Sequence, residues 1–474
     1  MIGNTDSMRD PAGMVMRQSG RVFRLVTSQG ETNARTYLTS PSVLRRCIEG
    51  SCVPTRVLPR EEWPNLPGTK EAVLVLEHER INFPSYPYEW SPGMLRAAGM
   101  LTLELAAELS REGAGLKDAT PFNVFFRGIR PVFIDALSVE RRDQADPLWF
   151  AYGQFVRTFL LPLIAARDLG WTLRRSFTGS RDGLDPATLY ARLRWHKLLR
   201  APAFGTITGP VLLAKLGLVT IIPTLEKRRT DPHRARFILE RLIGQLSRAL
   251  DCAGTRSVKS DWTEYLDPRV HPPEYHALRR EAVAAVLANN RPHRVLDVGT
   301  NGGAFALLAA SFGAEVVAID RDEAVVEQTY RHAITAGVNV LPLVVDLIDP
   351  TPATGWRNTE RTSFLERAAG QFDFVLCLAV LHHLVVGDGL ALREVMTLLG
   401  SLTTDLLVAE FVPASDIWCA KLARGRLVTE ERWSEAAFEA EALRFFRIEA
   451  RHTEGLRGRT LYVFRRNTVA YGVN

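Results

Sequence analysis

Short apolar runs alternate with glycine-containing turns along the second half of the chain. The run VLDV at residues 295–298 is followed by a turn with glycines at positions 299 and 303, and then by the small apolar residues of 304–310. A parallel strand covered on both faces reads as such an apolar run, whereas a half-exposed strand alternates apolar and polar residues. The pattern predicts the first strand, turn and helix of a nucleotide-binding type of α/β fold.

The turn that follows this strand has a composition that lets the main chain approach a ligand closely. Gly299 and Gly303 have no Cβ, so the backbone can turn tightly at both positions. Asn301 stands where many such loops carry a third glycine, and asparagine tolerates a positive φ better than most residues. We therefore expect a ligand at the carboxyl end of the strand.

Two carboxylates define the chemistry of that ligand. Asp320 closes the next apolar run, about 20 residues after the glycines, where a carboxylate can bind both ribose hydroxyls. Asp297 ends the first run, where it would repel a pyrophosphate at the helix amino terminus but would suit a cationic amino group. The charge pattern favours a ligand with a cationic amino acid end, although similar turns also occur in dehydrogenases and in sheets that bind nothing.

With these elements in this order, the chain resembles the class I S-adenosylmethionine-dependent methyltransferases. The resemblance continues through LPLVVD, which ends at Asp346, and through FDFVLCLAVLHHL at 372–384, which match the third and fourth strands of that family. It implies S-adenosyl-L-methionine as the cofactor, with Asp320 at the ribose and Asp346 at the adenine amino group. The residues that it assigns to cofactor binding are Asp297, Gly299, Asn301, Gly303, Asp320, Asp346 and Leu378.

The resemblance covers about residues 260 to 474 and implies a Rossmann-like methyltransferase sheet. We expect seven mostly parallel strands with helices on both faces, and an antiparallel strand near 459–466. The chain is too long for one ordinary core, and the polar, turn-rich stretch 251–262 is the best candidate linker. Two domains are therefore predicted, at residues 1–255 and 256–474.

The first half carries a second motif, in which the runs NVFF and PVFID flank the turn FRGIR and predict a hairpin. Asp118, Asn123 and Asp135 would gather at one end of it. This arrangement resembles the catalytic loop and metal-binding segment of protein kinase-like phosphotransferases, and implies a separate α+β domain. Lys117 and Ala136 depart from that family's pattern, so a degenerate domain that binds substrate or partner is favoured. Alternatively, the polar residues only stabilise a turn.

Candidate catalytic residues follow the later strands of the predicted sheet. His382 and His383 come directly after the fourth strand, where an imidazole could remove a proton from a hydroxyl or could merely pack. Glu410 ends the run LLVAEF and could bind the acceptor or anchor a loop. The long polar insert 355–367 could contact the acceptor or form a surface helix. Aromatic residues that could cover the cofactor, or pack at the domain junction, are Trp262, Tyr265 and Tyr275.

Composition and charge indicate which partners and which cellular location to expect. The formal charge of the 474 residues is +6, and its basic clusters at 227–236 and 457–466 are more typical of solvated surface than of a nucleic-acid site. Five cysteines without a CxxC pair argue against a disulfide framework. The apolar stretch 204–225 is interrupted by Pro210, Lys215 and Pro223, so no transmembrane span is expected. With no signal peptide apparent, the cytoplasm is the predicted location.

Both halves together also resemble the NoeA-related family of bacterial nodulation proteins, in LKDATPFNVFF, GWRNTERTSF and AEFVP. The preferred interpretation is an S-adenosylmethionine-dependent methyltransferase that acts on an oxygen of a carbohydrate-like or small polar acceptor, without a metal. Two alternatives stay open: a kinase-like phosphotransferase with a regulatory methyltransferase fold, and a noncatalytic scaffold that binds the cofactor. The oligomeric state and the acceptor do not follow from the sequence.

Overall fold

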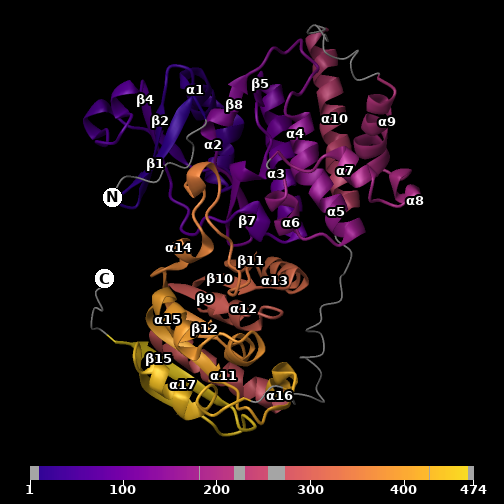
Figure 1. Cartoon of the computed structure of the whole chain (residues 1–474). Helices are drawn as coiled ribbons and strands as arrows, with labels where there is room; N and C mark the ends of the chain where they lie inside the picture. The colour runs from indigo at the N-terminus through magenta and orange to yellow at the C-terminus, as the bar shows by residue number, and fades with distance from the viewer. Residues whose placement is uncertain (1–9, 181, 218–229, 255–272, 426–427, 468–474) are drawn as a thin grey trace. The chain divides into compact units, whose positions relative to one another are not determined.

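The computed structural model describes residues 10–180, 182–217, 230–254, 273–425 and 428–467. The chain divides into two compact units (Figure 1). The first unit comprises residues 1–257 and 353–362, and the second comprises residues 258–352 and 363–474. The segment 353–362 therefore belongs to the first unit, although in sequence it lies within the second.

The first unit begins with an antiparallel sheet of four strands in the order β1-β2-β4-β3. The strands are β1 (Gly13–Gln18), β2 (Arg21–Val26), β3 (Thr55–Val57) and β4 (Leu74–His78). The helices α1 (Glu31–Thr39) and α2 (Pro41–Ile48) connect β2 to β3. Phe23, Leu25 and Val75 are almost fully buried in one apolar cluster, which fixes the register of β2 against β4.

The rest of the first unit is mainly helical. Its long helices, α3 (Pro92–Arg111) and α10 (Pro232–Ala253), pack against each other. Gly99 permits this approach, because a Cβ there would lie only 3.0 Å from Leu250 Cδ1. The shorter helices are α4 (Tyr152–Phe155), α5 (Leu161–Leu169), α6 (Leu173–Thr178), α7 (Pro186–Tyr190), α8 (Trp195–Leu198) and α9 (Gly209–Lys215).

Two small antiparallel strand pairs lie between α3 and α4. The strand β5 (Ala114–Leu116) pairs with β8 (Val139–Arg141), and β6 (Val124–Arg127) pairs with β7 (Arg130–Phe133). The second pair confirms the predicted hairpin, with Arg127 opposite Arg130 and Gly128 at φ 54° in the turn.

The second unit is built on a seven-stranded sheet in the order β11-β10-β9-β12-β13-β15-β14 (Figure 1). Its five parallel strands are β9 (Arg294–Val298), β10 (Glu315–Asp320), β11 (Val340–Val344), β12 (Phe372–Cys377) and β13 (Thr403–Phe411). The strand β15 (Thr460–Arg466) runs antiparallel to both β13 and β14 (Phe446–His452). The expected Rossmann-like, mixed sheet is therefore present.

The strand order reverses between β9 and β12. From β9 the chain moves outward to β10 and β11, and it then returns to β12 and continues to β13 on the other side. Right-handed crossovers in these two directions place the connecting helices on opposite faces of the sheet. Ligands of such sheets bind at the carboxyl edge beside this reversal. The helices of the unit are α11 (Pro273–Asn290), α12 (Ala304–Ser311), α13 (Glu323–Ala336), α14 (Phe364–Ala368), α15 (Leu392–Leu402), α16 (Ile417–Ala423) and α17 (Glu435–Ala442).

Two sequence predictions concern stretches outside the sheet, and the structure describes only part of each stretch. The stretch 251–262 was expected to be turn-rich, but α10 continues to Ala253, and residues 255–262 lie outside the described part of the chain. Of the apolar stretch 204–225, the described portion contains the short helix α9. Among the residues that the structure describes, no helix is long and apolar enough to cross a membrane.

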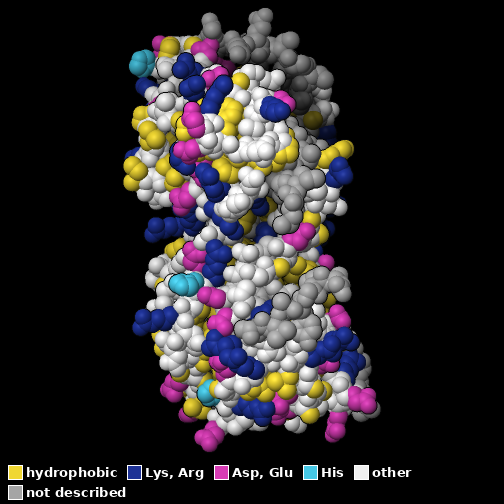
Figure 2. All heavy atoms as spheres, turned by 90° about the vertical axis from the view of Figure 1, so that its left-hand side faces the viewer, with side chains coloured by type: hydrophobic (Ala, Val, Ile, Leu, Met, Phe, Trp, Pro, Cys, Tyr) yellow, Lys and Arg dark blue, Asp and Glu magenta, His cyan; other side chains and the backbone are white. Residues whose placement is uncertain are grey.

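The state of the cysteines and the distribution of surface charge agree with what the composition predicts. All five cysteines are free thiols, as expected from their odd number and spacing. On the face seen in Figure 2, Lys and Arg side chains are interspersed with Asp and Glu rather than gathered in one continuous patch. That mixture is typical of a solvated surface.

Candidate functional site

The site begins at the turn after β9, where three residues adopt a positive φ. These angles are 69° at Gly299, 46° at Asn301 and 82° at Gly303, so the asparagine takes the left-handed conformation for which it was singled out. The amides of Gly299 and Thr300 both donate to the carbonyl of Ile319, at 2.9 and 3.0 Å. These two hydrogen bonds hold the turn against the end of β10, at the carboxyl edge of the sheet.

Asp297 is a buried carboxylate in this turn region. Its side chain is 3% exposed, and Thr300 Oγ1 donates to its Oδ2 at 2.7 Å. Burial raises the pKa of the carboxyl to about 6. Among the described residues, no cation lies within ion-pair distance of it. A buried carboxylate without a countercharge is costly, so this position suits a cationic amino group of a ligand.

Asp320 lies at the end of β10 and is oriented by the main chain. The amide of Asn301 donates to its Oδ2 at 3.2 Å, and the amide of Asp322 donates to its Oδ1 at 3.0 Å. Burial raises the pKa of this carboxyl. Because each carboxylate oxygen keeps a further lone pair, Asp320 can still accept two hydroxyl groups, as a ribose would offer.

The other two residues expected at the cofactor follow neighbouring strands. Asp346 is half-buried two residues after β11, and the amide of Ile348 donates to its Oδ1 at 3.0 Å. Leu378 follows β12 directly and is 7% exposed. The parallel strands β9, β10, β11 and β12 all end at the same edge, so the structure brings the expected residues together there. Their chemistry fits a ligand with an amino group, a diol and a flat heterocycle.

The two histidines begin a π-helical turn, His383–Gly387, close after β12. Their ring centroids are 4.3 Å apart. His382 is 2% exposed, and its Nδ1 has no hydrogen-bond partner in the described structure. Burial lowers the pKa of both imidazoles, that of His383 to about 4. Both rings are therefore neutral near pH 7, and His383 is the less buried of the pair.

Glu410 lies near the end of β13 but is fully buried in a polar cluster. Tyr275 Oη donates to Glu410 Oε1 at 2.6 Å, and Arg279 Nη2 donates to Glu410 Oε2 at 2.7 Å. Arg459 Nη1 donates to the hydroxyl of Tyr275 at 2.8 Å, and Arg459 Nη2 pairs with Asp416 at 2.9 Å. This placement favours a structural role for Glu410 over the catalytic role expected from sequence, because both of its oxygens already bind cluster members.

The arginines of that cluster were not found by sequence reasoning. Arg279 lies in α11 and Arg459 precedes β15, so nothing in local spacing connects them with Glu410. Their burial, at 4% and 1% exposure, becomes visible only once the sheet is assembled. Of the aromatic residues expected to cover the cofactor, Tyr275 is in this cluster, and Trp262 and Tyr265 lie outside the described residues.

The polar insert between β11 and β12 has a different neighbourhood from the one expected. Its segment 353–362 belongs to the first unit, where the Arg361 guanidinium lies 4.0 Å from the centre of the Phe122 ring. Thr354 and Arg361 exchange two backbone hydrogen bonds, at 2.9 and 3.1 Å. A surface helix was one of the two alternatives for this insert, and the structure has a short turn at Trp356–Asn358 and the helix α14 there.

In the first unit, the three polar residues of the kinase-like motif lie around the β6–β7 hairpin. Burial raises the pKa of Asp118, and the charge of Asp135 adds to that shift. Asn123 ends the turn before β6, and its Nδ2 is buried without a hydrogen-bond partner. Sequence reasoning missed Arg24 on β2, whose Nη1 donates to Asp135 Oδ1 at 2.7 Å. The sequence separation of 111 residues gave no signal for this pair.

Comparison with known proteins shows a protein family whose model matches most of the second unit, and a relative that is similar over nearly the whole chain. The model of a methyltransferase domain matches residues 273–442, a range that contains all the cofactor and catalytic candidates of this unit. The chain is 29% identical to the nodulation protein NoeA of Rhizobium meliloti (strain 1021) over 468 residues, which cover 97% of this chain and 95% of that protein.

Two further similarities cover less than half of this chain. The chain is 34% identical over 90 residues to a ubiquinone biosynthesis O-methyltransferase of Hahella chejuensis, which is 19% of this chain and 32% of that enzyme. The solved N-methyltransferase NodS of Bradyrhizobium japonicum WM9 aligns with 41% of this chain and 98% of its own, at 13% identity and a TM-score of 0.31. The match of the family model, and not this structural likeness, identifies a methyltransferase domain at residues 273–442.

Proposed function

We propose that this S-adenosyl-L-methionine-dependent methyltransferase transfers its methyl group to a hydroxyl of a carbohydrate-like or small polar acceptor. The proposal rests on one observation: the expected binding site for the methyl donor and a neutral histidine follow adjacent strands of one sheet. The donor site has the buried Asp297 and the main-chain-oriented Asp320, and the base is His383 after the adjacent strand β12.

The donor site would hold the cofactor through three carboxylates. Asp297 would accept the amino group of the methionine part, Asp320 the ribose hydroxyls and Asp346 the adenine amino group. Gly299 and Gly303 keep the turn free of side chains, and Leu378 offers an apolar surface. When bound, the cofactor supplies an electrophilic methyl group on a sulfonium sulfur.

His383 would act on the acceptor. A neutral imidazole nitrogen can accept the proton of an acceptor hydroxyl as the oxygen gains its bond to the methyl carbon. His382, in ring contact with His383, would fix the orientation of that imidazole. The site therefore needs to align the hydroxyl, take up one proton and exclude water, which are the main requirements of an in-line displacement.

Oxygen as the acceptor atom also has support among the relatives. The relatives that match only part of the chain are named O-methyltransferases, and the relative that covers 97% of it is named a nodulation protein. The free state of all five cysteines agrees with a location in the reducing cytoplasm.

The test uses the full-length protein with cofactor carrying a labelled methyl group and an extract of small metabolites and glycans. Label should enter a hydroxyl-bearing molecule, and Asp320→Ala should weaken cofactor binding at least about tenfold, the loss expected for hydrogen bonds to a charged group. Glu315→Ala, at the other end of β10, is the matched control. Labelled nitrogen or sulfur in the product would contradict the oxygen assignment, and unchanged affinity in Asp320→Ala would contradict the site.

The first unit, which we propose to be a kinase-like domain, would bind the acceptor or a partner. The pairing of Arg24 with Asp135 supports a degenerate kinase-like origin, because it places a cation beside the carboxylate that the motif assigns to metal binding. Surviving phosphotransfer is the second candidate function. Magnesium and ATP binding that is lost in Asp135→Ala would support it, and absence of nucleotide binding to the wild-type chain would exclude it. Cofactor binding without any methylated product would point to a scaffold.

A further inference from the structure

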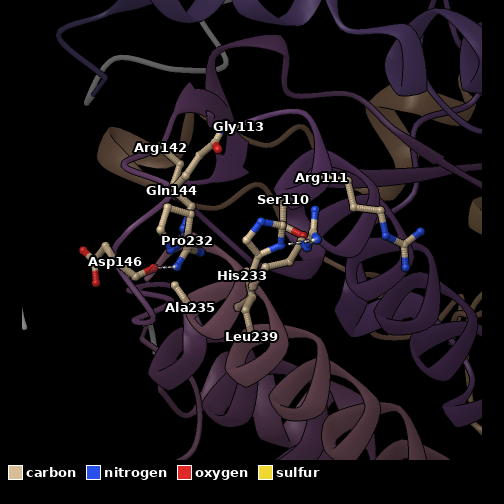
Figure 3. Close-up of a pocket in the computed structure, with 11 residues that line it drawn as sticks. Ser110, Arg111, Gly113, Arg142, Gln144, Asp146, Pro232, His233, Ala235 and Leu239 are labelled. Atoms are coloured by element: carbon tan, nitrogen blue, oxygen red, sulfur yellow. Dashed lines mark hydrogen bonds between the residues drawn. The ribbon is translucent and has the colours of Figure 1, made fainter. Parts of the chain in front are cut away.

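A cavity of about 90 Å³ lies in the first unit, and none of the residues assigned above lines it (Figure 3). It is lined by the end of α3, by the segment that follows β8 and by the first turns of α10. Three arginines and one histidine are among its lining residues, against a single acidic residue: Arg111, Arg142, Arg236 and His233, with Asp146. The space is sufficient for a small ligand rather than for a single water molecule.

Arg142 is the most informative residue of this cavity. It is half-buried, and its Nη2 donates to the main-chain carbonyl of Asp146. Burial lowers the pKa of its guanidinium, although the nearby carboxylates of Asp146, Asp143 and Glu140 act in the opposite direction. Within the described part of the chain, none of these carboxylates forms a direct ion pair with it. Because its direct acceptor is a neutral carbonyl, the guanidinium of Arg142 keeps further N–H groups that an anion could accept.

Two further cations lie on the first turns of α10. Arg236 Nη2 is 3.3 Å from His233 Nδ1, and, among the described residues, Arg236 also forms no ion pair. Arg111 differs, because its Nε pairs with Glu240 at 3.1 Å. Among the described residues, the cavity therefore has two arginines that form no direct ion pair with a carboxylate, Arg142 and Arg236.

Two carboxylates near the cavity accept main-chain amides. Asp146 Oδ1 accepts the amide of Leu148 at 3.0 Å, and Figure 3 shows its carboxylate directed away from the other labelled side chains. Asp231, which precedes the helix, accepts the amides of His233 and Arg234 at 2.9 and 3.1 Å. Since Asp231 already caps the helix end and keeps its negative charge there, the arginines that line the cavity, and not the helix end, would attract an anion.

We propose that this cavity binds a phosphate group, either as inorganic phosphate or as a small phosphate monoester. Arg142 would donate from inside the cavity and Arg236 from its rim, with His233 as a third donor. A guanidinium presents its N–H groups in a planar fork that matches the oxygens of a phosphate, which is why arginine is favoured over lysine at such sites. The site does not depend on methyl transfer.

The test is titration calorimetry of the full-length protein with inorganic phosphate and, separately, with glycerol 3-phosphate, at constant ionic strength. Arg236→Gln and Arg142→Gln should each weaken binding by about tenfold to 100-fold, as expected for a lost hydrogen bond to a charged group. Arg241→Gln, an exposed arginine of the same helix, removes one charge outside the cavity and is the matched control.

Three outcomes separate the possibilities. Binding that is lost in Arg236→Gln and kept in Arg241→Gln supports the site, and a preference for glycerol 3-phosphate assigns it to phosphate monoesters. Equal weakening in both variants would mean nonspecific attraction to net charge and would overturn the proposal. Absence of binding by the wild-type chain would also overturn it. Because Arg236 is exposed, its variant keeps the test decisive even if Arg142→Gln fails to fold.

Discussion

At the scale of single residues, ionisation of the buried Asp297 carboxyl lowers the stability of the folded protein. Its pKa is raised from an ordinary 3.8 to about 6, so the folded chain binds a proton more tightly than the unfolded chain does. The associated stability is fully present below pH 4 and is lost as the pH rises through 6, by an amount on the order of 3 kcal/mol. The ammonium of a bound cofactor would offset this loss.

Asp297→Asn should therefore raise the Tm of the cofactor-free protein at pH 7.5 and weaken cofactor binding at the same pH. The amide can still accept the hydrogen bond from Thr300, but it brings no charge into the protein interior. Calorimetric melting and cofactor titration measure the two effects. The difference in Tm should disappear near pH 4, where the aspartate is itself neutral. A lower Tm at pH 7.5 would contradict the assigned cause.

His383 gives a second prediction at this scale. Because burial lowers its pKa to about 4, it should remain a neutral base well below the pH at which an exposed histidine becomes protonated. We expect kcat to fall by about 10²–10⁴-fold in His383→Ala, which is the usual contribution of a general base. His452→Ala, at the exposed end of β14, is the control.

The pH profile of turnover at saturating cofactor provides the separate readout. It should lack the fall in rate below about pH 6.5 that a base with the ordinary pKa of histidine would cause. A limb at that pH which disappears in His383→Ala would show that the imidazole titrates normally during turnover, contrary to the effect of burial.

At the scale of elements, the turn after β9 requires a glycine at 299 for two reasons. Its φ of 69° is unfavourable for other residues, and a Cβ there would collide with Val380 Cγ2. Gly299→Ala should lower the free energy of unfolding by about 1–3 kcal/mol and weaken cofactor binding. Denaturant titration and cofactor titration measure these changes.

Two further variants separate the causes. Adding Val380→Ala to Gly299→Ala removes the collision and should recover part of the lost stability, leaving the cost of the positive φ. Gly313→Ala, at φ 93° with open space around it, should show that backbone cost alone. If the double variant is no more stable than Gly299→Ala, the collision is not the cause.

Local sequence patterns predicted the elements of the second unit because each was encoded by adjacent residues. The buried strand β9 was visible as an apolar run, and the positive φ of Asn301 followed from its place between two glycines. The partners of Glu410 were not visible, since Arg279 and Arg459 come from elements 180 residues apart in the chain. Long-range ion pairs depend on how the sheet is assembled, and no periodicity encodes them.

At the scale of the whole molecule, a substitution in the buried cluster around Glu410 tests whether the second unit can lose stability while the first unit keeps its own. Glu410→Leu should destabilise the second unit by about 3–5 kcal/mol, because it leaves buried arginines without their carboxylate. Adding Arg279→Met should recover part of this loss, since the second variant removes one of the uncompensated charges. Hydrogen exchange should show lost protection in β13 and β15, while β2 and β4 of the first unit stay protected. Equal loss in both units would contradict this expectation.

The assignment of segment 353–362 to the first unit has a consequence for dissecting the protein. The chain passes between units at 257/258, 352/353 and 362/363, so the units are joined by three covalent connections rather than by one. A truncation at residue 257 would leave the first unit without the Arg361 side chain that lies over Phe122, and would leave the second unit carrying an orphaned loop. Likewise, a single proteolytic cut between the halves would nick the chain without releasing either unit intact.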